Sequence, residues 1–302
     1  MAENDTGKTG KPAVRRLPPW LNKKIPLQGG ETVNNCLTEL KLDTVCRGAR
    51  CPNSLECKSR GRAAFLIMGP QCTRACRFCA MTSGEPAPLD AEEPARLALA
   101  VKRLGLKHAV VTSVTRDDLP DGGAAHFAAT VTAIRDECPG TTIEILVPDF
   151  WGDEEAWAVS ADSLPDVYNH NIETVERLYD LVRPKADFDR SLALLDFVKE
   201  RHPKMATKSG MMLGLGEELD EVVEAAQALR DVGVDIITVG QYLRPTSERT
   251  LEVVRFVPPE EFADLEKELK SLGFKVVACS PFVRSSYNAE EAFLLNAGAK
   301  KP

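Results

Sequence analysis

The stretch AAFLIMGPQCTRACRFC, residues 63–79, joins a short apolar run to three closely spaced cysteines. The run over 63–68 has the length and character of a strand that is buried on both faces, and a Gly-Pro pair ends it. Cys72, Cys76 and Cys79 follow with CX3CX2C spacing. In an α/β barrel the functional residues gather on loops at the C-terminal ends of the strands. The stretch therefore predicts the first βα loop of a barrel, with three thiols on that loop.

The rest of the chain repeats this alternation of short apolar runs with longer amphipathic stretches. Besides 63–68, strands are expected at 108–113, 142–147, 166–169, 206–212 and 235–240. Helices are expected at 92–104, 124–137, 172–182, 188–200, 217–232 and 259–272, with C-cap glycines at Gly105, Gly233 and Gly273. Six such units predict an α/β fold of the partial (β/α)6 TIM-type barrel class.

Composition and charge limit the classes of protein to which the chain can belong. The chain has 302 residues and a net charge of −7, and it contains no apolar run near the ~20 residues that cross a bilayer. The nine cysteines are an odd number and follow no secretory signal or transit-peptide pattern. We therefore expect a cytoplasmic protein with reduced thiols, without a membrane segment and without general nucleic-acid binding.

The first 30 residues are rich in Pro, Gly and Lys and lack an apolar period, which predicts an extended arm. Trp20, Leu21, Ile25 and Pro26 are its expected anchors. The segment 8–24 is basic, so it is either a solvated arm or a surface for an acidic partner.

A second cysteine triplet, Cys46, Cys51 and Cys57, precedes the first with CX4CX5C spacing. Thiolates hold iron-sulfur clusters, and a four-iron cluster bound by three cysteines keeps one iron without a cysteine. An open iron can chelate the amino and carboxylate groups of S-adenosylmethionine, and an electron passed to the sulfonium then releases a 5'-deoxyadenosyl radical. The lone cysteines Cys36 and Cys138 are interpreted as small buried hydrophobes.

Zinc is the main alternative for these thiols. A structural zinc site takes four protein ligands, yet none of the four histidines lies close in sequence to either triplet, and the paired CX2C spacing of a zinc ribbon is absent. A non-catalytic iron-sulfur or zinc protein for electron transfer or structure is the alternative of another class. Such a protein would show no cleavage of S-adenosylmethionine after reduction. No nucleophile elbow and no HEXXH motif occurs, so hydrolytic mechanisms have no support.

The CX3CX2C triplet on a first barrel loop, with Phe78 before its last cysteine, resembles the radical S-adenosylmethionine superfamily. The CX4CX5C triplet directly upstream is similar to that of the lipoyl synthase family. The resemblance covers residues 17–290, and its further motifs are PWL at 19–21 with Ile25-Pro26, SVTRDD at 113–118 with Gly122-Gly123, VPDF at 147–150, His170-Asn171 with Glu173-Thr174, TKSGMMLGLGE at 207–217 and RSSY at 284–287.

The resemblance implies a sulfurtransferase that inserts two sulfur atoms at carbons 6 and 8 of an octanoyl chain carried on a protein lysine. The implied partners are an octanoylated lipoyl-domain carrier of the 2-oxoacid dehydrogenase E2 or glycine cleavage H protein type, an electron donor such as ferredoxin or flavodoxin, and an iron-sulfur carrier that rebuilds a consumed cluster. The alternative enzyme is another sulfur-inserting member of the superfamily that acts on a free small molecule, as a biotin-synthase-like enzyme does.

The implied cofactors are two 4Fe-4S clusters and S-adenosylmethionine. One cluster, on the CX3CX2C cysteines, cleaves S-adenosylmethionine, and an auxiliary cluster on the CX4CX5C cysteines donates sulfur. A serine oxygen of RSSY completes the auxiliary cluster, with Ser286 as the expected ligand and Ser285 as the second choice. The implied catalytic residues are Cys72, Cys76, Cys79 and Ser286, and the implied auxiliary ligands are Cys46, Cys51, Cys57 and Ser286.

Three segments are expected within one structural domain. Residues 1–60 would form the arm and the auxiliary-cluster segment, residues 61–275 the barrel, and residues 276–302 a C-terminal segment with the RSSY motif. The barrel thus carries its second cluster on extensions at both ends of the chain.

Several polar side chains fall at or just after predicted strand ends, where barrel enzymes bind ligands. The candidates for contact with S-adenosylmethionine are Phe78, Thr115, Asn171, Glu173 and Lys208. Asn171 could instead cap the helix expected at 172–182, and Arg116, which also follows a predicted strand and could contact a ligand, could instead serve to bridge loops. Met211, Met212, Leu213 and Leu215 are candidates for the wall of an acyl channel, with core packing as the simpler interpretation.

Two positions depart from the family pattern. The family carries a histidine and a following proline after the segment that corresponds to 240–243, whereas this chain reads PTSERTLE at 245–252. Ser280 stands where the family has glycine before Pro281. Neither change removes an expected cluster ligand, but contacts near Thr250 and on the path to the serine ligand are not set by the resemblance.

Overall fold

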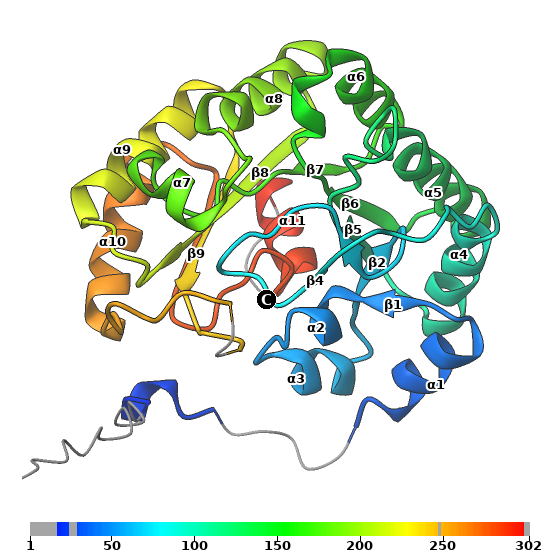
Figure 1. Ribbon diagram of the computed structural model, residues 1–302, viewed down its shortest axis with the longest axis horizontal. Coiled ribbons are helices and arrows are strands. Elements are labelled where there is room, and N and C mark those ends of the chain that lie inside the picture. Colours follow the sequence, from blue (N-terminus) through cyan, green and yellow to red (C-terminus); the bar gives the residue numbers. More distant parts are fainter. Residues whose placement is uncertain (1–16, 24–28, 247–248, 299–302) are drawn as a thin grey trace, which may run out of the picture.

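An open eight-stranded sheet is the frame of the computed structural model, which describes residues 17–23, 29–246 and 249–298 (Figure 1). The strands follow the order β1-β2-β5-β6-β7-β8-β9-β10, and all neighbours are parallel except β1, which is antiparallel to β2. Their bounds are β1 (Asp43–Thr44), β2 (Ala64–Ile67), β5 (His108–Ser113), β6 (Thr142–Leu146), β7 (Val167–Asn169), β8 (Ala206–Leu213), β9 (Ile236–Gln241) and β10 (Val276–Cys279). A separate pair joins β3 (Gln71–Cys72) to β4 (Thr82–Ser83).

Helices cover the outer face of this curved sheet (Figure 1). They are α4 (Glu93–Leu104), α5 (Ala124–Glu137), α6 (Glu154–Asp162), α8 (Phe188–Arg201), α9 (Leu219–Asp231) and α10 (Pro259–Ser271). Two buried apolar clusters fill the layer between sheet and helices, one around Phe65 and Phe127 and the other around Ile237 and Phe262. The arrangement confirms the predicted α/β class and partial barrel.

The six predicted strands are present as β2 and β5 to β9, each within one residue of its expected bounds. Five of the six predicted helices are α4, α5, α8, α9 and α10. Gly105 caps α4 in the left-handed conformation, as expected. Helices α1 (Glu31–Glu39) and α6 and the edge strands β1 and β10 were not predicted.

The helix expected at 172–182 is wrong in its first half. Helical structure begins only with the short helices η3 (Glu176–Leu178) and α7 (Tyr179–Val182). The segment before them instead pairs with β8 at Glu173, whose N–H donates to the Gly210 carbonyl at 2.9 Å and whose carbonyl accepts the Met212 N–H at 2.9 Å. Asn171 is therefore not a helix N-cap.

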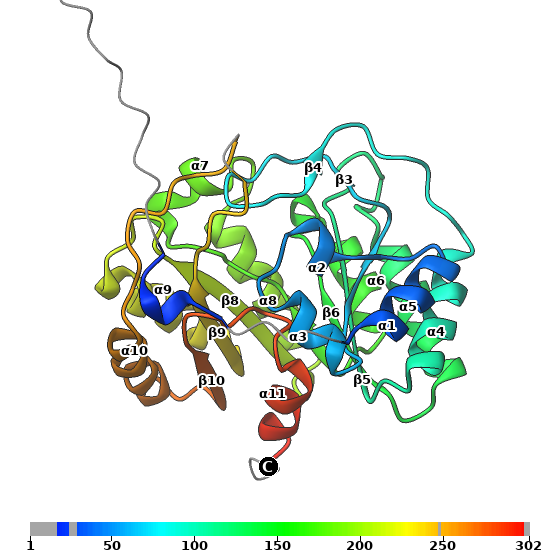
Figure 2. The same cartoon turned by 90° about the horizontal axis from the view of Figure 1, so that it is seen from below.

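The C-terminal helix α11 (Ala289–Asn296) lies inside the arc of strands and contacts β5 and β10 (Figures 1 and 2). Ala289 packs with Ala64 and Val110, whereas Ala292 packs with Val276. The helix thus bridges the two sides of the open sheet, and it begins two residues after the RSSY motif.

The N-terminal part packs beside the barrel as η1 (Pro19–Leu21), α1, α2 (Val45–Gly48) and α3 (Ser54–Ser59). Leu21 is buried, whereas Trp20 is more than a third exposed. The other expected anchors, Ile25 and Pro26, and most of the basic segment 8–24 lie outside the described residues. Within the described ranges, no helix has the length and apolar character needed to cross a bilayer.

Candidate active site

The cysteines of both triplets line one cavity of about 720 Å³. Its lining also includes the predicted site residues Phe78, Thr115, Asn171, Glu173 and Ser286. Lys208, the remaining predicted site residue, does not line it. The first barrel loop, the segment before the barrel and the segment after it therefore meet at one space.

The CX3CX2C loop presents its thiols with backbone support. Cys72 lies on β3, and its sulfur accepts the N–H of Arg74 at 3.4 Å, while the Cys79 sulfur accepts the N–H of Met81 at 3.4 Å. Burial, with the neighbouring thiols of Cys76 and Cys72, raises the pKa of Cys79 to about 12 despite the hydrogen bond from Met81. Partly buried thiols that accept backbone N–H groups fit the ligand set of an iron-sulfur cluster, whose potential such hydrogen bonds tune.

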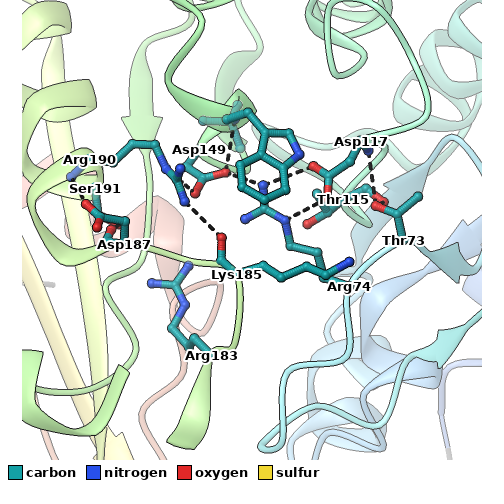
Figure 3. Close-up of polar contacts among 12 residues, drawn as sticks. Thr73, Arg74, Thr115, Asp117, Asp149, Arg183, Lys185, Asp187, Arg190 and Ser191 are labelled. Carbon is teal, nitrogen blue, oxygen red and sulfur yellow. Dashed lines mark hydrogen bonds and ion pairs between the residues drawn. The ribbon is translucent and has the colours of Figure 1, made fainter. Parts of the chain in front are cut away.

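Arg74, inside this loop, holds it to the neighbouring barrel units (Figure 3). Its guanidinium pairs with Asp117 at 2.8 Å and with Asp149 at 2.7 Å, and Asp149 also accepts from Arg190 at 2.8 Å. Burial alone would raise the pKa of Asp149, but the hydrogen bond and charge of Arg74, helped by Arg190, lower it to about 2. Asp149 therefore remains an anion that fixes the loop.

Trp151 lies over this ion-pair network. Its ring centroid is 4.6 Å from the guanidinium carbon of Arg74 and 5.0 Å from that of Arg190. Phe150 and Trp151 both have positive φ, at 47° and 56°, which non-glycine residues rarely adopt. The turn after β6 is thus a strained backbone that sets Asp149 and Trp151 against the cysteine loop.

The CX4CX5C thiols lie on α2, on α3 and on the turn between them. Cys46 belongs to α2 and Cys57 to α3, and the Cys51 N–H donates to the Cys46 carbonyl at 3.1 Å. Burial, with the neighbouring Cys46 and Cys51, raises the pKa of Cys57 to about 11. The three thiols are close enough to influence one another electrostatically.

The two serines of RSSY have different surroundings. The Ser285 hydroxyl accepts from Asn169 Nδ2 at 2.6 Å and donates to Asn171 Oδ1 at 3.1 Å. Within the described part of the chain, the Ser286 hydroxyl makes no hydrogen bond, and Ser286 lines the cavity beside the CX4CX5C cysteines. A side chain at Gly240 would collide with the Val283 carbonyl, so that glycine permits the close approach of this segment to β9.

The sulfur atoms are reduced and are not gathered around one point. All nine cysteines are free thiols. Among the described residues, no three His, Cys, Asp or Glu side chains converge so as to hold one metal ion.

Arg183 is a site residue that the sequence reasoning missed. The residue is 8% exposed and lines the cavity, and no carboxylate of the described residues lies within 4.0 Å of its guanidinium. Its Nη1 donates to the carbonyls of Asn171 and Ile172 at 2.9 Å and to the Tyr179 hydroxyl at 3.0 Å, while its Nε has no partner. A buried guanidinium without a carboxylate partner is suited to bind an anion.

Two further groups beside Arg183, the side chains of Glu173 and His170, have shifted pKa values. Burial raises the pKa of Glu173, against the lowering effects of Arg183 and of the hydrogen bond from Asn171 at 3.1 Å. Burial lowers the pKa of His170 to about 4, and its Nδ1 contacts the Val147 carbonyl at 2.9 Å. His170 is therefore neutral near pH 7, and its buried, unpartnered Nε2 can accept a hydrogen bond from a ligand.

Lys208 and Arg116 take structural positions. Lys208 Nζ lies 2.9 and 3.0 Å from the carboxylate oxygens of Glu144, and that carboxylate also accepts from Asn169 at 2.8 Å. Arg116 pairs with Asp118 at 2.7 Å and donates to the Met68 carbonyl at 3.1 Å, which is the loop bridge considered from the sequence.

The apolar candidates divide between the cavity and the core. Met211 and Met212 line the cavity, whereas Leu213 and Leu215 are buried with the core of the second barrel half. Thr115 lines the cavity, and its carbonyl accepts from the N–H and the hydroxyl of Thr73 at 3.1 and 3.0 Å.

Comparison with known proteins gives concordant results. A family model described as the Radical SAM superfamily matches residues 66–229. The lipoyl synthase of Caldanaerobacter subterraneus subsp. tengcongensis is 53% identical over 283 residues, covering 94% of this chain and 99% of that protein. The lipoyl synthase of Rubrobacter xylanophilus is 50% identical over 288 residues, covering 95% and 88% respectively. The crystal structure of Streptococcus suis SuiB bound to S-adenosylmethionine has a similar fold, with a TM-score of 0.55 at 13% identity over 75% of this chain and 54% of that one.

Proposed function

The chain belongs to the lipoyl synthase family of the Radical SAM superfamily, and we propose that its two cysteine triplets divide the reaction of a lipoyl synthase around one cavity. The enzyme is a sulfurtransferase that inserts two sulfur atoms at carbons 6 and 8 of a protein-bound octanoyl chain. The observation that carries the proposed division of labour is that the thiols of both triplets and Ser286 line the same space.

Cys72, Cys76 and Cys79 would hold a 4Fe-4S cluster, which when bound supplies the electron that releases an adenosyl radical from S-adenosylmethionine. The residues fit this group, because two of the sulfurs accept backbone N–H groups and all three cysteines line the cavity. The chain's own contribution is to hold the loop rigidly, which Arg74 does through its two carboxylate partners.

Arg183 would bind the carboxylate of S-adenosylmethionine, because it is a buried guanidinium beside Cys76 without a carboxylate partner among the described residues. Asn171 and Glu173 would take the amino group, and Phe78 and Thr115 border the same space. Lys208 would act indirectly, by fixing Glu144 and through it Asn169.

Cys46, Cys51, Cys57 and Ser286 would hold the auxiliary cluster, which is a substrate of the reaction because it gives up sulfur. Ser286 is preferred over Ser285, whose hydroxyl is occupied by Asn169 and Asn171. An oxygen ligand is a poorer match than thiolate for a soft iron site, so it should leave more readily and expose sulfide to attack.

Met211 and Met212 would border the octanoyl chain, since they supply the flexible apolar part of the cavity wall. The acyl group would arrive on a lipoyl-domain carrier of the E2 or H protein type. A ferredoxin- or flavodoxin-type donor would provide electrons, and an iron-sulfur carrier would rebuild the auxiliary cluster.

Residues 1–60, 61–275 and 276–302 would act as the auxiliary-cluster segment, the radical barrel and the serine-bearing segment of one domain. Nine free cysteines support a reducing compartment, which we take to be the cytoplasm.

An anaerobic assay tests this function. The reconstituted protein is mixed with S-adenosylmethionine, a reductant and an octanoylated lipoyl-domain peptide, and the peptide mass is measured together with 5'-deoxyadenosine. A peptide that gains two sulfurs supports the proposal. Deoxyadenosine without a sulfurised peptide would favour the alternative of a small-molecule substrate, as in a biotin-synthase-like enzyme.

A further inference from the structure

One lysine of the N-terminal arm contacts two segments that meet beside the CX4CX5C triplet. Lys23 Nζ lies 2.5 Å from Glu56 Oε2 and also donates to Asn53 Oδ1. The same ammonium is 5.2 Å from the ring centroids of both Phe282 and Tyr287. A positively charged ammonium is attracted electrostatically to the negative face of an aromatic ring. Lys23 is therefore attracted to both segments.

These contacts fall next to the proposed auxiliary-cluster ligands. Glu56 directly precedes Cys57, Tyr287 directly follows Ser286, and Asn53 lies in the stretch that leads to Cys57. The Cys57 N–H donates to the Asn53 carbonyl at 2.9 Å. A shift of any of these residues would move a ligand.

The two segments also touch one another at the lysine. The Tyr287 hydroxyl donates to Glu56 Oε1 at 3.1 Å, and Asn53 Nδ2 donates to the Phe282 carbonyl at 2.8 Å. Asn53 is 1% exposed, and the side chains of Lys23 and Glu56 are less than a fifth exposed. Removal of the ammonium would leave the buried Asn53 oxygen without a donor and Glu56 without its closest cation, which is unfavourable.

We propose that Lys23 is a positioning residue that clasps the auxiliary-cluster site, holding the segment of Cys51 and Cys57 against the segment of Ser286. This inference rests on the proposed function, in which those residues and Cys46 bind the auxiliary cluster. The auxiliary site must lose its cluster and regain it, and this clasp keeps the ligands in one geometry while that happens. Lys23 thereby affects the reaction through the cluster ligands, without touching the reacting atoms.

The clasp is tested first on the reduced, metal-free protein by hydrogen exchange with mass spectrometry. Lys23→Met, which keeps most of the apolar stem, should speed exchange in peptides that cover 53–57 and 282–287 by about fivefold, the effect of losing an ion pair and a cation–π contact. Lys23→Arg should restore protection. Lys267→Met, which removes an exposed lysine paired with Asp264, is the matched control and should change neither peptide.

The second readout is the release of iron to a chelator after anaerobic reconstitution. Lys23→Met should lose auxiliary iron faster by a similar factor, while iron on the CX3CX2C site and S-adenosylmethionine cleavage stay at wild-type levels. Unchanged exchange, or unchanged auxiliary iron release, would overturn the clasp. A wild-type protein that binds only about four irons would instead contradict the auxiliary site itself, and that result is seen before any variant is compared.

Discussion

The guanidinium of Arg74, within the CX3CX2C loop, lies 2.7 Å from the buried carboxylate of Asp149, which follows β6. The pair joins the first barrel loop, which follows β2, to the unit of β6, which lies beyond β5 in the sheet, and Arg190 on α8 shares the same carboxylate. The position of the three thiols is therefore set by side chains from several barrel units, which is why the cysteine spacing alone does not make a site.

Replacement of Asp149 by asparagine should destabilise the metal-free protein by about 3 kcal/mol, because it leaves two arginines beside a buried neutral group. Urea unfolding of the reduced protein measures this change. Asp162→Asn is the control, since Asp162 pairs with Arg201 at the surface and should contribute little. Equal effects of the two variants would contradict the role of Asp149.

The buried pair of Glu144 and Lys208 predicts a specific acid sensitivity. Burial would raise the pKa of Glu144, but the charge of Lys208 lowers it from 4.5 to about 2. Because the folded-state pKa is depressed, the pair stabilises the fold fully above pH 4.5, and this stability is lost as the pH falls toward 2. Glu144→Gln should cost about 3 kcal/mol near neutral pH, and the cost should shrink over that window in urea unfolding experiments. A cost independent of pH would refute this account.

Alanine substitutions of the two RSSY serines should have different effects on the reaction. Ser286→Ala should cleave S-adenosylmethionine normally but form little sulfurised peptide, because the auxiliary cluster loses its oxygen ligand. Ser285→Ala, whose hydroxyl only links Asn169 to Asn171, is the matched control and should retain most product. Wild-type product from Ser286→Ala, or the reverse order of the two variants, would reassign the ligand.

Arg183 should be a determinant of S-adenosylmethionine affinity. Arg183→Met should weaken binding by about 10- to 100-fold, the expected loss for a charge-assisted hydrogen bond in a buried site. Equilibrium binding of S-adenosylmethionine to the anaerobically reconstituted protein measures it. Arg177→Met removes an exposed arginine paired with Glu221 and should bind as the wild type does. An unchanged dissociation constant for the Arg183 variant would exclude this contact.

The frame of the fold could be predicted because its strands are short apolar runs buried on both faces, as β5 and β9 are. The edge strand β10 was missed because it has only four residues, of which Val276 and Cys279 alone are buried, and it follows closely on the turn at Gly273. The helix assigned from Ile172 failed for another reason, since pairing of Glu173 with β8 overrides local helical periodicity.

The residues of the candidate site also include some that the sequence could predict and some that it could not. The cysteines could be found from the sequence because two triplets of thiols so close together are typical of iron-sulfur ligands. Arg183 could not, because a single arginine before a proline has no distinctive pattern, and the role proposed for it rests on its burial without a carboxylate partner among the described residues. Lys208 shows a different limit of the sequence, since its place at a strand end suggested contact with a ligand, whereas in the structure its ammonium contacts Glu144 and does not line the cavity.

The most direct test of the central claim, that both triplets act on one substrate in one cavity, is isotope transfer. The protein is reconstituted with sulfur-34 sulfide so that it holds about eight irons, freed of excess sulfide, and given S-adenosylmethionine, reductant and octanoylated peptide made with natural sulfur. The account predicts a peptide carrying two sulfur-34 atoms, with production of 5'-deoxyadenosine. Deoxyadenosine with an unlabelled or unsulfurised peptide would contradict it.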